Sequence, residues 1–302
     1  MDIKAEIIRN VLRKVRQLEV RTNRLLDGHL MGVYRSIFKG QGIEFEEVRE
    51  YTVGDDVRSI DWNITAKMNR PFIKKFREDR ELTVLLLIDI SASLDFGSME
   101  LSKREVVTEL ASLLAFSANR NNDKVGLLLF SDRIEGFVAP DKGRRHILRI
   151  IRDILFHEPM ARGTDITAIL RHLNGILKKR AIIFLLSDFL QQRSDAGKLI
   201  DALEITNRRH DLVCIKIEDP REGDLPDLGL VTFRDPETGE VLWVDTSQRE
   251  FRERYGLERY HRGKQLEERL KKSAIDLLKI DTRENYLQAL EQFLKRRIFR
   301  RR

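Results

Sequence analysis

The chain has one cysteine among its 302 residues, and this scarcity excludes a disulfide framework. Cys214 lies inside an apolar run, where a buried, unreactive thiol is expected. Long hydrophobic segments are also missing, since no apolar run approaches the roughly 20 residues that a membrane-spanning helix needs. The first residues are polar and charged, unlike a signal peptide. We therefore expect a cytoplasmic protein with no membrane span.

Motifs for nucleotide binding are absent as well. Gly40 and Gly42 begin a G-x-G-x-x-G pattern, but Phe45 stands where the third glycine is needed. Lys264 follows a glycine, but Gln265 stands where a P-loop has serine or threonine. None of the six histidines falls in a metal-ligand or nucleophile motif. The chain should not hydrolyse nucleotide by itself.

Apolar residues are plentiful and gather in short runs. They make up 41% of the chain, enough for a full-sized core, while charged residues make up 35% and leave a formal net charge of +7. Strand-like runs alternate with segments of helical spacing, which predicts an α/β fold with a doubly wound, mostly parallel sheet and helices on both faces. We expect strands over 82–89, 125–130, 134–138, 181–186, 212–217, 230–233, 241–244 and 275–280, and helices over 99–118, 143–157, 166–177, 196–207, 248–272 and 283–295.

Residues 1–80 are expected to form an N-terminal part, and residues 81–302 the sheet domain with its C-terminal helices. Apolar residues from Ile3 to Leu26 recur at helical spacing with basic residues between them, which predicts an amphipathic helix. Its basic face could contact a membrane or nucleic acid. We favour the alternative, in which the apolar stripe packs on the body of the protein.

A small β-containing module is expected after this helix. Within it, 57–68 reads as a helix capped by Asp55 or Asp56, and 73–76 reads as a strand. Asp61 follows an isoleucine and precedes a tryptophan, and an apolar wall of this kind would raise the pKa of a catalytic acid. The balance of acids and arginines favours instead a web of ion pairs that fixes the module to the following domain.

One stretch organises the rest of the chain. Residues 82–94 read L-T-V-L-L-L-I-D-I-S-A-S-L, a run typical of a parallel strand buried on both faces. Polar residues begin where this strand ends, with Asp89 followed at alternate positions by Ser91 and Ser93. Ligands of open α/β sheets gather at the carboxyl ends of the strands. One carboxylate and two hydroxyls are hard oxygen donors of the kind that Mg²⁺ or Mn²⁺ accepts.

Two later residues are expected at the same edge of the sheet. Asp188 closes the strand over 181–186, and Thr164 lies in a glycine-containing loop that opens a helix. Taken alone, Thr164 could simply cap that helix. Together with Asp89, Ser91 and Ser93, these residues could surround one octahedral cation and leave a position open for a partner's oxygen.

These residues resemble the metal-ion-dependent adhesion site of von Willebrand factor A domains. The likeness lies in D-I-S-A-S at 89–93, G-T-D at 163–165 and S-D at 187–188. It implies a von Willebrand factor A-like fold with Mg²⁺ as the ion, Mn²⁺ or Ca²⁺ being alternatives, and it implies Asp89, Ser91, Ser93, Thr164 and Asp188 as the metal site. In that family an acidic side chain of a protein ligand completes the coordination sphere.

A second block resembles the bacterial family catalogued as domain of unknown function 58. It reads E-F-E-E-V-R-E-Y-T-V-G-D-D-V-R-S-I-D-W-N-I-T-A-K and precedes the strand that ends in D-I-S-A-S. The resemblance covers roughly residues 35–295. It implies a cofactor or substrate adaptor of a MoxR-type AAA+ ATPase, acting in the maturation or remodelling of other proteins.

The sequence therefore predicts a non-enzymatic, metal-dependent protein-interaction module. Its expected partners are a MoxR-type ATPase and a client protein that carries an acidic residue. Two alternatives remain open. A metal with two acids could activate water, as in a hydrolase, although such sites usually hold more carboxylate or histidine. The tail from Lys295 to Arg302 has six basic residues and could contact nucleic acid, although we expect a solvated helix end.

Overall fold

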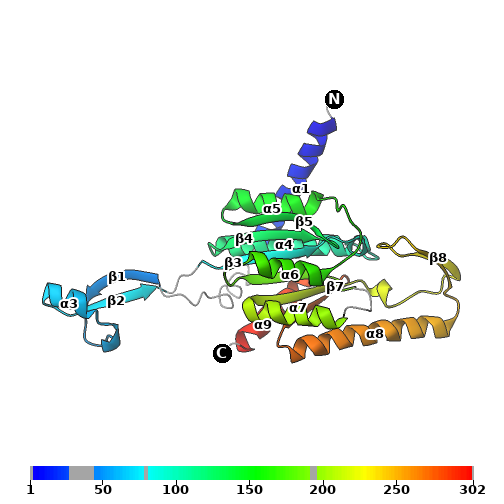
Figure 1. Ribbon diagram of the computed structural model, residues 1–302. Helices are drawn as coiled ribbons and strands as arrows, with labels where there is room; N and C mark the ends of the chain where they lie inside the picture. The colour runs from blue at the N-terminus through cyan, green and yellow to red at the C-terminus, as the bar shows by residue number, and fades with distance from the viewer. Residues whose placement is uncertain (1–2, 27–43, 78–80, 191–195, 301–302) are drawn as a thin grey trace.

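Six strands form the central sheet of the computed structural model, which describes residues 3–26, 44–77, 81–190 and 196–300. Their spatial order is β10, β7, β6, β3, β4, β5 (Figure 1). All neighbours run parallel except β4 and β5, which form an antiparallel hairpin. The bounds are β3 Thr83–Asp89, β4 Lys124–Phe130, β5 Ile134–Asp141, β6 Ile182–Ser187, β7 Asp211–Glu218 and β10 Asp276–Asp281. The predicted doubly wound, mostly parallel sheet is confirmed.

The centre of the sheet is buried on both faces. Along β3, Val84 and Ile88 point into one hydrophobic core, whereas Leu85 and Leu87 point into the other. Successive side chains of a strand alternate between its faces, so a strand covered on both sides must be apolar throughout. Burial on both faces therefore explains why the residues that follow position 82 form a continuous apolar run.

Two layers of helices cover the sheet. One face packs against α1 Ile3–Leu25, α4 Lys103–Arg120, α5 Arg144–Phe156 and α9 Tyr286–Arg300. The other face packs against α6 Ile166–Ile176, α7 Ala196–Arg209 and the end of α8 Arg249–Lys272. None of the helices in the described part of the chain combines the length and the apolar character needed to cross a membrane.

The N-terminal helix α1 packs on α4 and α5, as expected from its apolar stripe. Val15 is buried in the same core as those helices. Glu19 accepts two hydrogen bonds from Arg144 of α5, at 2.5 and 2.8 Å. Helix α1 ends at Leu25, within one residue of the end of the stretch predicted as helical.

The last helix was predicted over 283–295, but α9 runs from Tyr286 to Arg300. Two further predicted helix boundaries were wrong because capping residues were overlooked. Helix α4 begins at Lys103 and not at residue 99, since Ser102 and Glu105 form a reciprocal capping box. The helix expected over 57–68 is divided into a 3₁₀ turn, η2 Val57–Ser59, and α3 Trp62–Met68. Asp61 caps α3 by accepting hydrogen bonds from the first backbone N–H groups of that helix.

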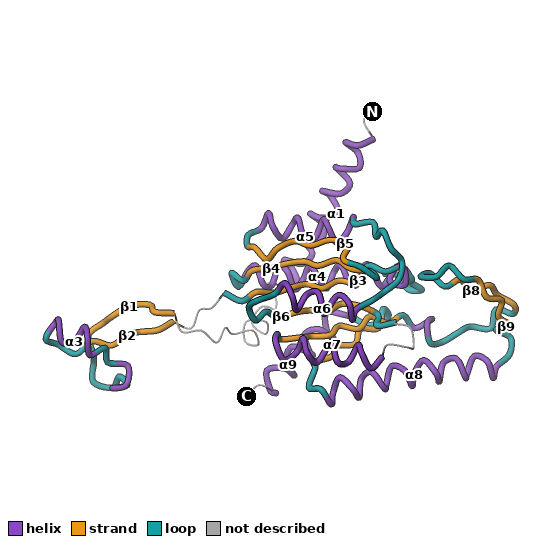
Figure 2. Tube along the Cα trace, viewed as in Figure 1, coloured by secondary structure: helices purple, strands orange, loops and turns teal. Residues whose placement is uncertain are grey.

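Strands β1 Glu44–Glu50 and β2 Phe72–Arg77 form the small module together with η2 and α3. Figure 2 shows this module apart from the six-stranded sheet. Arg49 donates two hydrogen bonds to Asp55, at 2.7 and 2.8 Å, and these bonds hold the pKa of the Asp55 carboxyl well below its usual range. These ion pairs lie inside the module, and a connection to the following domain stays a prediction.

Strands β8 Leu230–Arg234 and β9 Val241–Asp245 form an antiparallel hairpin, which is the third sheet, and both lie where strands were predicted. The hairpin and α8 both belong to the long connection between β7 and β10. They lie at the right of the sheet in Figure 1, on the side where β3 ends.

Candidate metal site at the carboxyl edge of the sheet

The first part of the site is the tight turn that follows β3. Asp89 accepts a hydrogen bond from the backbone N–H of Ser91 at 2.9 Å and another from the hydroxyl of Ser187 at 2.6 Å. The hydroxyls of Ser91 and Ser93 lie 3.1 Å apart, and the short 3₁₀ turn η3 Ala92–Asp95 holds them together. All four side chains are buried, so their polar atoms are directed at one another.

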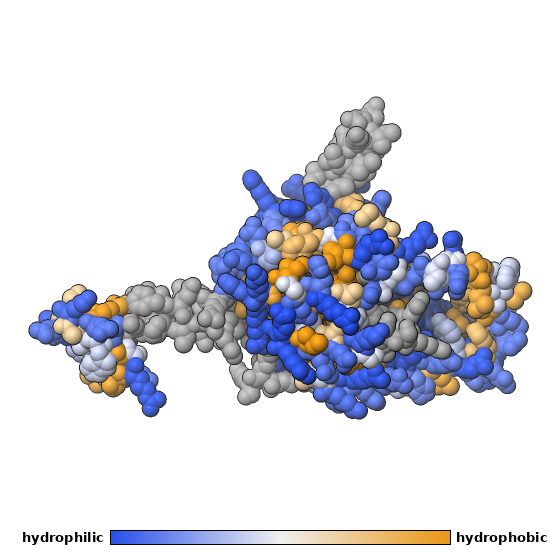
Figure 3. Space-filling view, viewed as in Figure 1, coloured by the Kyte–Doolittle hydropathy of each residue, from blue (hydrophilic) through white to orange (hydrophobic). Residues whose placement is uncertain are grey.

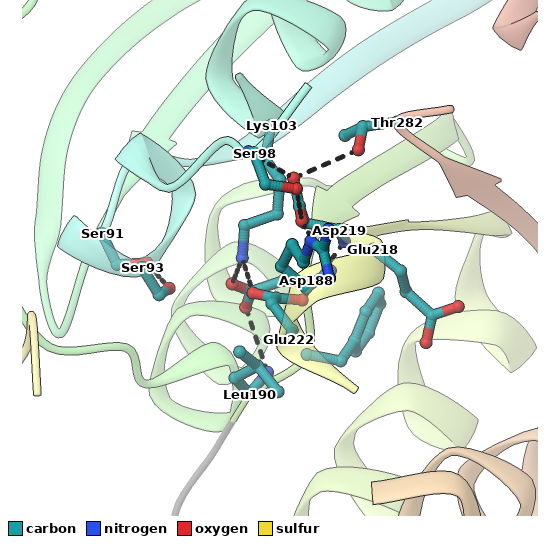
Figure 4. Close-up of polar contacts among 12 residues, drawn as sticks. Ser91, Ser93, Ser98, Lys103, Asp188, Leu190, Glu218, Asp219, Glu222 and Thr282 are labelled. Atoms are coloured by element: carbon teal, nitrogen blue, oxygen red, sulfur yellow. Dashed lines mark hydrogen bonds and ion pairs between the residues drawn. The ribbon is translucent and has the colours of Figure 1, made fainter. Parts of the chain in front are cut away.

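Asp188 brings the end of β6 to the same place. It pairs with the ammonium group of Lys103 at 2.7 Å and accepts the backbone N–H of Leu190 at 3.1 Å. Lys103 is fully buried at the start of α4 and also pairs with Glu222 (Figure 4). Glu222 in turn pairs with Arg259 of α8. A chain of alternating charges thus runs from the site to α8.

The two aspartates act on each other electrostatically. Burial and the negative charge of Asp188 together raise the pKa of Asp89 to about 7, against the hydrogen bonds from Ser187 and Ser91. Burial alone would lower the pKa of Lys103, but the charges of Asp188 and Glu222 outweigh it and raise that pKa. Lys103 therefore stays charged at neutral pH. The negative charge of Asp89 is unfavourable in this buried place beside Asp188, and a bound cation would stabilise it.

The loop before α6 supplies Thr164. Asp165, and not Thr164, caps α6, so the capping role considered for Thr164 is excluded. The Thr164 hydroxyl donates instead to a carboxylate oxygen of Glu237, at 3.0 Å. The backbone N–H of Ala92 donates to the carbonyl of Arg162 at 3.1 Å and so ties this loop to the turn after β3.

A fourth loop, after β7, supports the site. Asp219, which follows β7, accepts hydrogen bonds from the backbone N–H of Ser98 at 2.8 Å and from the hydroxyl of Thr282 at 3.2 Å (Figure 4). Ser98 lies between η3 and α4, so this contact fixes the segment that carries Ser93 and Lys103. The site is therefore held by backbone and side-chain bonds from four separate loops.

The predicted site residues fit a hard divalent cation by the chemistry of their donors. Asp89 and Asp188 contribute carboxylates, and Ser91, Ser93 and Thr164 contribute hydroxyls, all of them oxygen ligands. Within the described residues there is no group of three or more histidine, cysteine, aspartate or glutamate side chains that could hold a metal ion. A metal at this edge would depend on the hydroxyls.

Sequence reasoning missed three charged residues at this edge. Lys103 could have been found, because it stands three and four residues before the buried Val106 and Val107 and so lies on the buried face of α4. Glu222 ends the short 3₁₀ turn η5 Pro220–Glu222, and Glu237 lies in the turn between β8 and β9, so no helical periodicity assigned either side chain to a buried face.

The family model described as "Protein of unknown function DUF58" matches residues 47–265. The chain belongs to this family. An uncharacterised DUF58 relative from Mycobacterium bovis is 32% identical over 231 residues, which cover 75% of this chain and 71% of that protein. An uncharacterised protein from Mycobacterium tuberculosis shows the same identity and coverage. The membership predicted from the sequence is confirmed.

Two solved structures resemble this DUF58 chain at low identity. The conserved hypothetical protein BatB from Bacteroides thetaiotaomicron has 17% identity and a TM-score of 0.46, covering 72% of this chain and 98% of that chain. An aerotolerance-related membrane protein from Bacteroides fragilis has 18% identity and a TM-score of 0.48, covering 71% and 99%. The von Willebrand factor A-like architecture expected from the sequence is present in the sheet order and helical layers described above.

Two basic residues of the C-terminal segment of the DUF58 chain form ion pairs within the protein. Arg297 is buried and pairs with Asp211 of β7 and, at 2.8 Å, with Asp276 of β10. Lys295 pairs with Glu291 one turn earlier on α9. Arg297 therefore serves the packing of α9 on the sheet edge and Lys295 pairs within α9, which weakens the nucleic-acid alternative.

Proposed function

We propose that this DUF58 protein is a metal-dependent protein-interaction module whose ion is Mg²⁺. The ligands would be the side chains of Asp89, Ser91, Ser93, Thr164 and Asp188. The supporting observation is that polar side chains of three separate loops lie at one edge of the sheet, buried in the turns after β3 and β6 and half-buried at Thr164. Bound Mg²⁺ would supply a positive charge for an acidic side chain of a partner.

The donor set favours binding over hydrolysis. Metal-dependent hydrolases hold their ion mainly with carboxylate or histidine and activate a water on it. Here three of the five proposed ligands are hydroxyls, and Asp188 already pairs with Lys103. We expect no turnover of phosphoester or peptide panels by the Mg²⁺-loaded protein. If the wild type turned over one of these substrates and Asp89→Ala abolished the turnover, the protein would be a hydrolase and the proposed interaction module would be wrong.

Calorimetric titration with Mg²⁺ tests the metal site directly. The wild-type protein should bind one ion per chain, and Ser91→Ala combined with Ser93→Ala should remove this binding. Ser59→Ala combined with Ser273→Ala is the matched control, because both serines lie away from the site and neither is buried. Equal Mg²⁺ affinity in all three proteins would falsify the proposed ligands.

The proposed partner is a MoxR-type AAA+ ATPase, which the family resemblance suggests. A cognate ATPase should be retained on the immobilised protein with Mg²⁺ and released by a chelator. It should also be lost with the double alanine variant that lacks both site serines. If the ATPase is retained equally with chelator and with these substitutions, partner binding does not depend on the metal. Because the partner consumes ATP, we expect the complex in the cytoplasm, which cell fractionation can check.

A further inference from the structure

The turn between β8 and β9 is shaped by its own hydrogen bonds. The carboxylate of Asp235 accepts the backbone N–H groups of Glu237 at 2.8 Å and Thr238 at 3.2 Å. The backbone N–H of Gly239 donates to the carbonyl of Asp235 at 2.8 Å. Gly239 has φ of 75°, a conformation that favours glycine. The turn therefore presents its side chains in one fixed arrangement.

Glu237 is the side chain that this turn directs into the candidate site. Its neighbours Asp235, Pro236 and Thr238 are exposed, whereas Glu237 is half-buried. Its carboxylate accepts the hydroxyl of Thr164 at 3.0 Å. A residue from a distant hairpin thus reaches the loop that precedes α6.

Three of the predicted metal ligands act on this carboxylate. Besides the hydroxyl of Thr164, the hydroxyl of Ser93 hydrogen-bonds with the Glu237 carboxylate, and the negative charge of Asp188 lies close enough to repel it. A third acid beside Asp89 and Asp188 is unfavourable without a compensating cation. Lys103 is shared between Asp188 and Glu222, so a cation at the hydroxyls would balance the remaining charge.

The hairpin is anchored at its base and at its tip, with little packing between. Val244 and Thr246 are buried at the base. Leu242 and Trp243 of β9 are 65% and 68% exposed, and Figure 3 shows hydrophobic residues gathered over this end of the molecule. A cleft of about 660 Å³ opens between the turn, α7 and α8. Withdrawing the tip would break few apolar contacts.

We propose that Glu237 is an internal ligand of the metal site and takes the place that a partner's acidic side chain would take. This inference rests on the proposed function, since it presumes that Mg²⁺ binds at Asp89 and its neighbours. A tethered carboxylate acts at an effective concentration of roughly millimolar or more. A partner must therefore displace the hairpin, and weakly binding acidic proteins are rejected.

Mg²⁺ affinity gives the first test. Glu237→Gln keeps the shape of the side chain and its acceptor for Thr164 but removes the charge. Because ligand charge tunes cation affinity, Mg²⁺ should bind about tenfold more weakly to this variant. Glu240→Gln is the matched control, because Glu240 is an exposed acid of the same turn, and it should bind like the wild type.

The position of the hairpin gives a second readout, independent of affinity. The chain has two tryptophans, so Trp62→Phe leaves Trp243 of β9 as the sole tryptophan reporter. Mg²⁺ should raise the fluorescence anisotropy of Trp243 when Glu237 is present and leave it unchanged in the Glu237→Gln background. An equal response in both backgrounds would overturn the inference.

Competition in trans gives the third readout. A labelled peptide copying residues 235–240 should bind the Mg²⁺-loaded Glu237→Gln variant at least about tenfold more tightly than the wild type, in which the tethered carboxylate competes. The same peptide with glutamine at the position of Glu237 should bind neither protein. Equal peptide binding to wild type and variant would overturn the inference.

The two proposals fail in different ways. If the wild type binds no Mg²⁺, or if the Ser91→Ala and Ser93→Ala double variant binds it equally, the metal site itself is wrong. If Mg²⁺ binding depends on those serines but is the same with and without the Glu237 charge, only the internal ligand is wrong.

Discussion

The carboxyl edge of the central sheet and the small N-terminal module differ in which side chains they bury. At the sheet edge, Lys103 and Asp188 are buried and paired. In the module, Trp62 is 67% exposed and Val53 is fully exposed. One region places charge inside the protein, and the other places apolar surface outside it.

This difference predicts how much stability a substitution removes in each region. A buried charge has lost its hydration and depends on its partners, so removal of one partner is expensive. An exposed apolar side chain has few contacts to lose, so its removal hardly changes the free energy of unfolding. Substitutions at the sheet edge should therefore affect stability far more than substitutions on the outer surface of the module.

Lys103→Met should have the largest effect. Methionine fills similar space but leaves the carboxylate of Asp188 buried without its ammonium partner and takes from Glu222 one of its two cations. Breaking a buried ion pair in this way costs about 3–5 kcal/mol. Urea unfolding followed by circular dichroism should show a loss of this size.

The matched control is Lys124→Met. Lys124 pairs with Glu81 at the surface, where the two side chains are 45% and 52% exposed. Exposed pairs contribute up to about 1 kcal/mol. If both lysine variants lose the same stability, burial does not distinguish the sheet edge from the surface.

Asp219→Asn should have an intermediate effect that depends on pH. Asp219 is buried and accepts hydrogen bonds from Ser98, Arg221 and Thr282. Hydrogen bonds to a charged group are worth about 1.5–3 kcal/mol, and we expect a loss in this range at pH 7. Unfolding of Asp224→Asn is the control, since the Asp224 side chain is 85% exposed.

The sign of the pH dependence follows from the direction of the shift. Burial raises the pKa of Asp219, but hydrogen bonds from Ser98 and Arg221 outweigh burial and lower it overall. A lowered pKa stabilises the folded state above the unfolded value of about 3.9, and this contribution is lost as the pH falls below it. The difference in free energy of unfolding between the wild type and Asp219→Asn should become smaller from pH 7 to about pH 3. A gap that widens in acid would contradict this assignment.

Trp62→Ala should have the smallest effect. Trp62 follows the capping residue Asp61, but the cap bonds go to Asn63 and Ile64, and the loss of a mostly exposed side chain changes the free energy of unfolding by less than about 0.5 kcal/mol. Phe184→Ala provides the contrast, because Phe184 is completely buried in the core and its loss should cost about 3–5 kcal/mol. A Trp62→Ala loss as large as that of Phe184→Ala would show that the module surface is packed.

Much of this architecture could be predicted from the sequence because its signals are local. The apolar run ending at Asp89 indicates a doubly covered strand, and its neighbours on the sheet carry similar runs. The convergence of strand ends then placed Asp188 near Asp89. The start of α4 was also readable from the S-x-x-E pattern at Ser102, although the longer apolar spacing concealed it.

The position of Glu237 could not be predicted in this way. It lies 73 residues after Thr164, in a turn whose composition indicates only a hairpin. Periodicity assigns faces of helices and strands, but it does not say where the tip of a hairpin folds back. The same limit applies to Arg297, whose place in a basic run suggested a solvated tail and whose side chain is buried between β7 and β10.

Glu109 of α4 links the two ends of the chain and so affects the order in which the protein can fold during synthesis. Its carboxylate pairs with Arg21 of α1, 88 residues earlier, and accepts the hydroxyl of Tyr286 of α9, 177 residues later. At about 5–20 residues per second, Tyr286 is synthesised roughly 10–35 s after Glu109. For that time α1 and α4 can pair on the ribosome, but the last partner of this buried acid is still missing.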